Sequence, residues 1–207
     1  MVSGYAQTYY LMRQGLSGCD FTVRARELGL APPEDGTLRL TFLGRDYTVD
    51  ETGVYPEGDD VASFNARTVI IYYLTSGGQG EASYDFRSIR SFSQGLFDGD
   101  RGVWGGKLNA KDRLSLEMFE AAVTLIGAQQ MQVKNGAYPY LLHAFPKVPS
   151  LITYNEGDEE FPDHIDIKFG ANALNFLPFE TLAVLHGLIQ HSLTKSNGKL
   201  SVKIQEK

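Results

Sequence analysis

The sequence predicts an α+β fold in which a mainly antiparallel sheet, built from hairpins, packs against about five helices. Three observations support this prediction. Short runs with apolar side chains at every second position follow one another closely, as the strands of hairpins do. Longer runs with helical spacing do not alternate regularly with these strands. The chain has 207 residues, of which 43% are hydrophobic, so we expect residues 1–207 to form a single globular domain.

The first two helices are indicated by spacing and by capping residues. Residues 4–16 carry apolar side chains that share one face of a helix. Asp20 can cap a second, short helix that runs to Leu28 and ends at Gly29, because aspartate suits the N-cap and glycine suits the position after a helix. Residues 31–36 are rich in proline and glycine and break the chain.

Apolar and polar side chains alternate in residues 37–50, which predicts a β-hairpin. We expect its turn at Gly44-Arg45, with glycine first in a two-residue loop, which is typical of a type II′ turn. Because the side chains of a strand alternate between two faces, one face of this hairpin should lie against the core. The apolar positions are Leu38, Leu40, Phe42, Tyr47 and Val49.

The middle of the chain predicts a buried helix and a strand. Asp60 can cap a helix that runs to about Ser76, and the glycine-rich residues 77–80 end it. These glycines follow a helix instead of preceding one, so they do not present a helix amino terminus to a phosphate. A strand is expected at residues 84–89.

A long loop follows this strand. Residues 94–111 are rich in glycine and charge and contain Trp104. They form either a surface loop whose tryptophan folds back onto the body or a mobile flap over a pocket. Residues 112–130 then predict a helix from the spacing of their apolar side chains.

Three strands and a helix are expected in the carboxyl-terminal third. The strands are residues 140–145, 150–154 and 165–169. Pro178 suits the first turn of a last helix that runs to about Leu193. Asn197-Gly198 should then turn the chain into a final alternating strand at residues 200–204.

Composition and charge argue against several classes of partner. The formal net charge of -6 argues against a nucleic-acid groove and against an anionic membrane surface, because both need basic side chains. The amino terminus lacks the basic region of a signal peptide, and the longest apolar run, residues 69–74, is too short to span a bilayer. We therefore expect a cytoplasmic protein. Cys19 is the only cysteine, and we interpret it as a small hydrophobic residue near a helix start.

The densest cluster of ionisable side chains lies in residues 155–166, here called the acidic turn. It connects two strands that we expect to be antiparallel neighbours, so its carboxylates should lie close together. Hard cations such as calcium and magnesium take oxygen ligands of this kind. The candidate binding residues are Asp158, Glu159, Glu160, Phe161 and Asp163, together with Trp104 from the loop at residues 94–111.

The end of the acidic turn adds an imidazole. His164 and Asp166 lie two residues apart on an expected strand, so they face the same side. An imidazole beside a carboxylate can bind zinc or iron, or can act as an acid–base pair. The candidate metal ligands are Asp158, Glu160, His164 and Asp166.

A structural interpretation of the acidic turn stands beside the metal interpretation. The turn does not follow the EF-hand pattern, and His164 and Asp166 point away from the apolar side of their strand, where they can face water. Phe161-Pro162 is typical of a packing plug. In that case the acids accept hydrogen bonds and fix the turn as a brace, since networks of carboxylates are structural as well as catalytic.

The remaining histidines do not form a recognisable motif. His186 lies on the apolar stripe of the last helix, where a histidine is usually a satisfied core residue, and His143 lies inside an expected strand. The chain contains no His-Glu-x-x-His motif, no Gly-x-Ser-x-Gly elbow and no Walker or Rossmann glycine pattern. The sequence therefore names no cofactor and leaves open whether the protein is an enzyme.

Several segments together resemble domain-of-unknown-function family 3786, a prokaryotic family found mainly in anaerobes. The resemblance covers about residues 20–193, and its most specific part is the string Gly157-Asp158-Glu159-Glu160-Phe161-Pro162. The other matching segments are residues 40–47, 71–74, 85–87 and 145–149, with the helix start at Leu177-Pro178. Relatives carry Phe-Asp where this chain has Phe169-Gly170, and His164 is not part of the family pattern, so the resemblance implies no ligand role at these positions.

The resemblance also implies a metabolic setting. Some relatives are fused to a cysteine-rich iron–sulfur segment that is similar to one in corrinoid proteins of one-carbon metabolism. The 207 residues contain no such segment. The implied setting is anaerobic redox or corrinoid-linked metabolism, and the resemblance supplies no catalytic residues.

Three functions are compatible with these observations. The first is a ligand- or partner-binding domain for a small molecule or a redox protein, with the acidic turn and the Trp104 loop at the rim of a pocket. The second is a carboxylate-dependent, hydrolase-like metal enzyme that uses Asp158, Glu159, Glu160 and His164. The third is an interaction module whose acidic turn is a structural brace.

Overall fold

The computed structural model describes residues 4–58, 63–93, 114–157 and 162–204, and these contain five α-helices and two antiparallel sheets. The α+β prediction is thereby confirmed. The helices are α1 (Gly4–Met12), α2 (Phe21–Leu28), α3 (Phe64–Thr75), α4 (Leu116–Leu125) and α5 (Phe179–Ile204). The strands are β1 (Leu38–Phe42), β2 (Arg45–Asp50), β3 (Gly53–Pro56), β4 (Phe86–Ser88), β5 (Gln129–Gln130), β6 (Ala137–Phe145), β7 (Val148–Asn155) and β8 (His164–Gly170). Short 3₁₀ helices cover Arg13–Gly18, Ile89–Phe92 and Ala173–Asn175.

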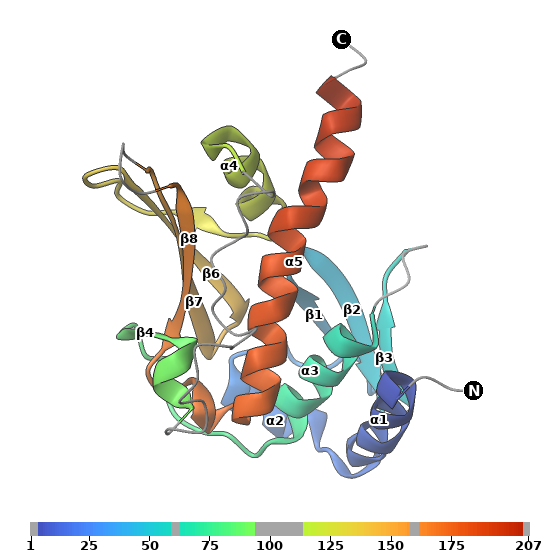
Figure 1. The fold of residues 1–207 in the computed structure, drawn as a ribbon. Coiled ribbons are helices and arrows are strands. Elements are labelled where there is room, and N and C mark those ends of the chain that lie inside the picture. Colours follow the sequence, from blue (N-terminus) through green and yellow to red (C-terminus); the bar gives the residue numbers. More distant parts are fainter. Residues whose placement is uncertain (1–3, 59–62, 94–113, 158–161, 205–207) are drawn as a thin grey trace.

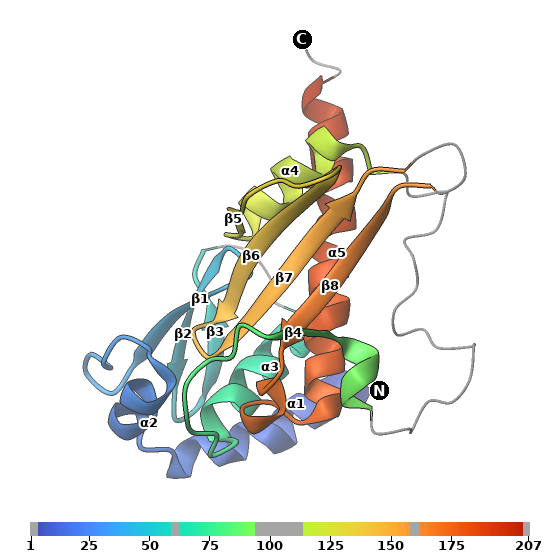
Figure 2. The same ribbon diagram turned by 90° about the vertical axis from the view of Figure 1, so that its left-hand side faces the viewer.

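The larger sheet has the strand order β4-β8-β7-β6-β5, and the smaller sheet has the order β1-β2-β3 (Figure 1). Helix α5 lies along one face of the larger sheet, and α3 and α4 pack against α5 (Figure 2). Strand periodicity explains this arrangement, because Ile152 of β7 and Phe169 of β8 are buried on the helix side while Asp166 is exposed on the other. Among the described helices, none has the length and apolar character that a membrane span requires.

Local signals set the first helix boundaries. The carboxylate of Asp20 accepts a hydrogen bond from the backbone N–H of Val23 at 3.0 Å, and Gly29 ends α2 in the left-handed region, with φ 71°. Both predictions for this helix are confirmed. The predicted cap of α3 is wrong, because the helix begins at Phe64 and the hydroxyl of Ser63 accepts from the N–H of Ala66. Serine directly before the first helical residue supplies the N-cap, and Asp60 lies outside the described residues.

The hairpin of β1 and β2 is confirmed, but its predicted turn type is wrong. Phe42 pairs with Arg45, so the two-residue loop is Leu43-Gly44, and both residues have positive φ, 49° and 72°. These angles define a type I′ turn, in which glycine is second. A side chain at Gly44 would also be excluded by α4, because a Cβ there would lie 2.0 Å from the carbonyl oxygen of Leu125.

Several element boundaries differ from the sequence prediction. The first helix ends at Met12 and continues as a 3₁₀ helix, and the helix expected at residues 112–130 ends at Leu125, since Gly127 has φ 84° and Gln129–Gln130 pairs with β6. The expected strand at residues 200–204 is wrong, because α5 continues to Ile204. Continuing a helix bonds the backbone groups within the segment, whereas a terminal strand needs a partner strand.

Three stacked aromatic rings connect the two sheets through the core. Phe145 of β6 stacks on Phe42 of β1 with ring centroids 4.9 Å apart, and Tyr73 of α3 stacks on Phe145 at 4.0 Å. The hydroxyl of Tyr73 donates to the carbonyl of Leu28 and accepts from the N–H of Lys147. These contacts hold β1 beside the end of β6, and residues of both strands line the site described next.

Candidate functional site

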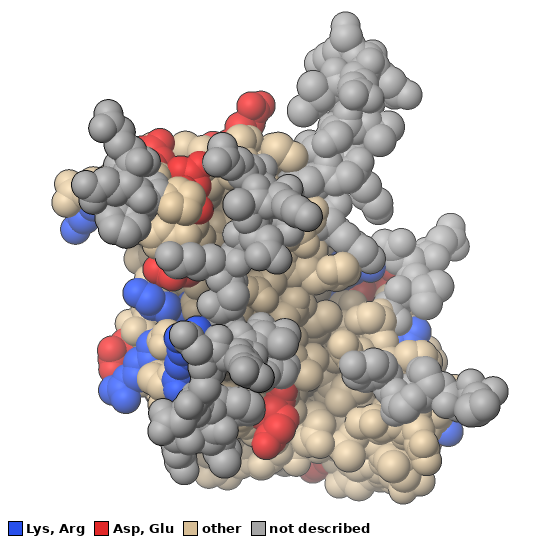
Figure 3. All heavy atoms as spheres, viewed as in Figure 1, with Lys and Arg blue, Asp and Glu red and all other residues tan. Residues whose placement is uncertain are grey.

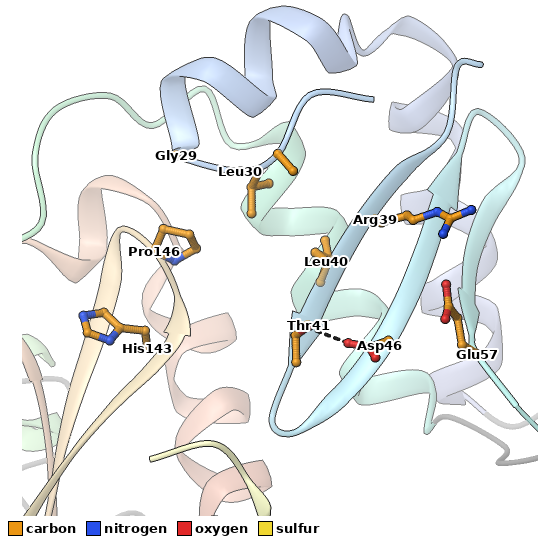
Figure 4. Close-up of a pocket in the computed structure, with 10 residues that line it drawn as sticks. Gly29, Leu30, Arg39, Leu40, Thr41, Asp46, Glu57, His143 and Pro146 are labelled. Atoms are coloured by element: carbon orange, nitrogen blue, oxygen red, sulfur yellow. Dashed lines mark hydrogen bonds between the residues drawn. The ribbon is translucent and has the colours of Figure 1, made fainter. Parts of the chain in front are cut away.

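A hollow of about 460 Å³ lies where the smaller sheet meets the larger one, and we call it the junction hollow (Figure 4). Its polar lining residues are Arg39, Thr41, Asp46, Glu57 and His143. Its apolar lining residues include Leu30, Leu40 and Pro146. The β1–β2 hairpin forms one wall, and the end of β6 with the β6–β7 turn forms the other.

The side chains of β1 alternate between the core and the surface, and this places polar side chains on the first wall. Leu40 is 7% exposed and faces the core, whereas its neighbours Arg39 and Thr41 are exposed. The hydroxyl of Thr41 donates to a carboxylate oxygen of Asp46 on β2 at 2.6 Å. Glu57, which follows β3, has its carboxylate on the same side of the hairpin as the Arg39 guanidinium in Figure 4. This wall therefore carries both signs of charge.

The second wall contributes an imidazole. His143 is exposed near the end of β6, and its Nε2 lies 3.2 Å from the hydroxyl of Tyr84, at hydrogen-bonding distance. The two rings meet edge to face with centroids 6.1 Å apart. Because an imidazole can donate and accept hydrogen bonds, His143 suits a polar group on a ligand.

Gly29, which follows α2, lies in the lining of the junction hollow. A Cβ at Gly29 would lie 3.4 Å from the Cβ of Pro146, so the end of α2 touches the β6–β7 turn. The hollow is of a size typical of small-ligand sites, which have volumes of roughly 300–1,000 Å³.

The acidic turn lies at the opposite end of the β6–β7 hairpin from the junction hollow, and two of its described carboxylates, Asp163 and Glu156, accept hydrogen bonds. Asp163 accepts from the hydroxyl of Tyr154 at 2.7 Å with one oxygen and from the backbone N–H of Gly157 at 2.6 Å with the other. Burial, together with the bond to Asp163, raises the pKa of Tyr154, so the phenol stays protonated and can donate. These bonds connect β7 with the start of β8.

Two tyrosines on β6 also donate to carboxylates, one in the acidic turn and one on α4. The hydroxyl of Tyr138 donates to Glu156 at 3.1 Å, and that of Tyr140 donates to Glu120 of α4 at 3.3 Å. The bond to Glu156 raises the pKa of Tyr138, and burial raises the pKa of Tyr140. Figure 3 shows acidic side chains near α4 at this end of the larger sheet and basic side chains near β4. The described tyrosines here stabilise the sheet end and do not line the junction hollow.

The predicted metal ligands are only partly described. His164 pairs with Asn155 and Asp166 with Thr153 on the outer face of β8. In the described part of the chain, no three His, Cys, Asp or Glu residues are grouped so that they could hold a metal ion. Asp158 and Glu160 lie outside the described residues, as do Trp104, Glu159 and Phe161. The metal enzyme that uses them stays a prediction, and so does the flap around Trp104.

Sequence reasoning missed the junction hollow. Arg39 and His143 belong to strands that are far apart in the sequence, and tertiary packing such as that of Phe42 on Phe145 brings those strands together. Two signals were present. Pro32-Pro33 precedes an alternating strand, which indicates a strand edge that its own chain does not pair, and His143 interrupts an otherwise apolar run.

The fold and the junction hollow define an α+β domain with a polar hollow between two antiparallel sheets. The chain belongs to the family described as Domain of unknown function (DUF3786), whose model matches residues 20–191. This confirms the family resemblance of the sequence. No curated protein and no solved structure matches the chain.

Proposed function

We propose that this protein is a ligand-binding domain and that the junction hollow is its ligand site. The observation that carries the proposal is the composition of the hollow. Apolar side chains of Leu30, Leu40 and Pro146 lie beside groups of both charge signs and an imidazole. Ligand sites combine an apolar lining with a few polar groups that orient the ligand.

The lining also indicates the chemistry of the ligand. An apolar part would lie on Leu30 and Pro146, out of water, where burial contributes about 25 cal/mol per Å². Asp46 and Glu57 would accept from a cationic or hydrogen-bond-donating group, and Arg39 would bind an anionic one. With two carboxylates and one guanidinium in the lining, the hollow favours a ligand that carries positive charge beside an apolar group.

The ligand site is tested by nuclear magnetic resonance with the ¹⁵N-labelled protein and a library of small polar fragments. We expect fragments that carry an amine and an apolar ring to shift the amides of Arg39, Thr41 and His143. The variants Glu57→Gln and Asp46→Asn should each lower the affinity for such a fragment about tenfold, because each removes a charge-assisted contact. Asp166→Asn, on the uncovered face of β8, is the matched control and should leave the affinity unchanged. Shifts confined to other surfaces, or full affinity in both hollow variants, would overturn the proposal.

The family resemblance extends the proposal to a ligand or partner from anaerobic redox or corrinoid-linked one-carbon metabolism. Protein purified without oxygen should then carry a chromophore, or should change the visible spectrum of added cobalamin, haem or flavin. A featureless spectrum and unchanged spectra on titration would remove this extension and leave the ligand site itself standing.

A further inference from the structure

The outer edge of β1 has backbone groups that face the junction hollow. Glu57 donates its backbone N–H to the carbonyl of Asp46, so the backbone of Asp46 points toward β3 and away from β1. Asp46 pairs with Thr41, and in an antiparallel ladder a pair that does not exchange hydrogen bonds points its N–H and C=O groups outward on both strands. Arg39 is two residues from Thr41, so its backbone also points outward.

The described segment that precedes β1 turns back and pairs with the outer edge at the start of this strand through one residue only, Glu34. The backbone of Thr37 exchanges two hydrogen bonds with Glu34, at 2.8 and 2.9 Å. Continuing that ladder would place Pro33 and Pro32 beside β1, and prolines carry no N–H to donate. Among the described residues, none bonds the backbone of Arg39 or Thr41 on this side. Within the part of the chain that the structure describes, the edge is therefore open along the wall of the hollow.

The opposite wall is also a strand edge. Met131 donates to the carbonyl of Pro139, so alternate residues of β6 point their backbone groups away from β7, and His143 is one of these residues. In the described part of the chain, β5 pairs only with Tyr140 and Leu141. A bulge between His143 and Phe145 bends the end of β6. The hollow thus lies between β1 and the end of β6 (Figure 4), and no described residue pairs with the outer backbone groups of Arg39, Thr41 or His143.

We propose that the junction hollow binds an extended peptide segment of a partner protein, which adds a strand to the edge of β1 at Arg39 and Thr41. This inference rests on the proposed function and specifies its ligand. Exposed edges are templates for strand addition, in which main-chain hydrogen bonds supply affinity and alternate side chains supply specificity.

The lining defines the side chains of the bound segment. One residue would point inward toward Leu30 and Pro146 and would be apolar. Its neighbours would point outward toward Asp46 and Glu57, where the excess of carboxylates over Arg39 selects lysine or arginine. The occupant is therefore a peptide in which apolar and basic residues alternate.

A random heptapeptide library displayed on phage provides the first test. Selection on the full chain should enrich peptides with alternating apolar and basic residues. The affinity of an enriched peptide should fall about tenfold for Thr41→Pro, which removes the outward N–H and leaves the β1–β2 ladder intact. Thr41→Val keeps that N–H and loses only the hydroxyl bonded to Asp46, so it is the matched control and should bind within about twofold of the unmodified protein. Amide spectra of both variants report whether the hairpin is preserved.

N-methylation of the selected peptide tests the backbone contacts directly. Methylation of alternate amides should weaken binding about tenfold, and methylation of the intervening amides should leave it unchanged. Equal sensitivity at all positions, or no enrichment of any peptide, would overturn strand addition. If fragments still shift the hollow in that case, the proposed function stands and only the peptide inference fails. A second copy of the chain could instead pair with the edge of β1. Light scattering would then detect a dimer, and Thr41→Pro would break it. This outcome would also overturn the inference.

Discussion

Both carboxylate oxygens of Asp163 accept hydrogen bonds from residues that precede it in the chain, one in β7 and one in the acidic turn. One oxygen accepts from the Tyr154 hydroxyl and the other from the Gly157 N–H. Tyr154 is only 3% exposed, so its hydroxyl needs a partner within the protein. The two bonds connect Asp163 to β7 and to the start of the acidic turn, so the carboxylate fixes the turn against the sheet. At this residue the geometry supports the brace interpretation of the acidic turn.

A double-mutant cycle at this pair should reveal the brace. We expect Tyr154→Phe to lower the free energy of unfolding by about 1–2 kcal/mol, because it removes one hydrogen bond to a carboxylate, and Asp163→Ala to lower it further, because it also removes the bond from Gly157. The double variant should lose about 1 kcal/mol less than the two single losses together, since one bond is counted in both. Urea denaturation measures the free energy of unfolding of the two single variants and of the double variant.

The control for this cycle is Asp166→Ala, which changes an exposed carboxylate on the same strand and should alter stability by less than about 0.5 kcal/mol. Losses that simply add would show that the two side chains do not interact. A rise in melting temperature with added divalent ions that Asp163→Ala abolishes would favour the metal interpretation instead.

Among the elements, α5 presents a titratable group to the inner face of the larger sheet. His186 is 3% exposed, its ring lies 6.1 Å from that of Phe169, and its buried Nδ1 has no hydrogen-bond partner among the described residues. It is the core residue that the sequence predicted, although one ring nitrogen is unsatisfied. Burial lowers its pKa from the ordinary 6.5 to about 4.

This shift predicts a loss of stability in mild acid. Between pH 6.5 and pH 4 the unfolded chain binds a proton at His186 while the folded chain does not, so the free energy of unfolding falls as the pH falls through this window. Each pKa unit corresponds to about 1.4 kcal/mol, so the loss attributable to His186 at pH 4 is about 3 kcal/mol. Above pH 6.5 this residue should contribute no pH dependence.

Denaturation of His186→Leu between pH 7.5 and pH 4 measures the effect. The variant should lose less stability across this range than the unmodified protein, because it has no proton to bind at this position. His191→Leu, which changes an exposed histidine on the same helix, should keep the full pH dependence. Identical pH profiles for the unmodified protein and His186→Leu would show that this histidine does not control acid stability.

Elements with local signals could be predicted from the sequence, and elements defined by tertiary partners could not. Asp20 and Gly29 mark both ends of α2 through their own backbone preferences. Gln129–Gln130, in contrast, forms a strand only because β6 lies beside it, and Gly53–Pro56 forms one only because of β2. The candidate site follows the same rule. The position of the acidic turn could be read from the sequence, but the hollow between Arg39 and His143 depends on how the two sheets pack.

At the scale of the whole molecule, the stack of Phe42, Phe145 and Tyr73 joins three parts of the fold. Its rings come from β1, β6 and α3, and all three side chains are at most 1% exposed. The Tyr73 hydroxyl adds bonds to the end of α2 and to the β6–β7 turn. Since both sheets share this contact, we propose that the chain unfolds as the single domain that its length predicts.

Phe145→Ala tests this cooperativity. The substitution removes the middle ring of the stack and should lower the free energy of unfolding by about 3–5 kcal/mol, the usual effect of truncating a buried phenylalanine. Hydrogen exchange should then accelerate to the same extent in β2 of the smaller sheet and β7 of the larger sheet, because both open in one global transition. Phe145→Leu keeps most of the side-chain volume and should lower the free energy of unfolding by less than about 1.5 kcal/mol. Acceleration confined to one sheet, or two separate unfolding transitions, would show that the sheets belong to independent units. In that case the junction hollow would lie at a boundary between domains.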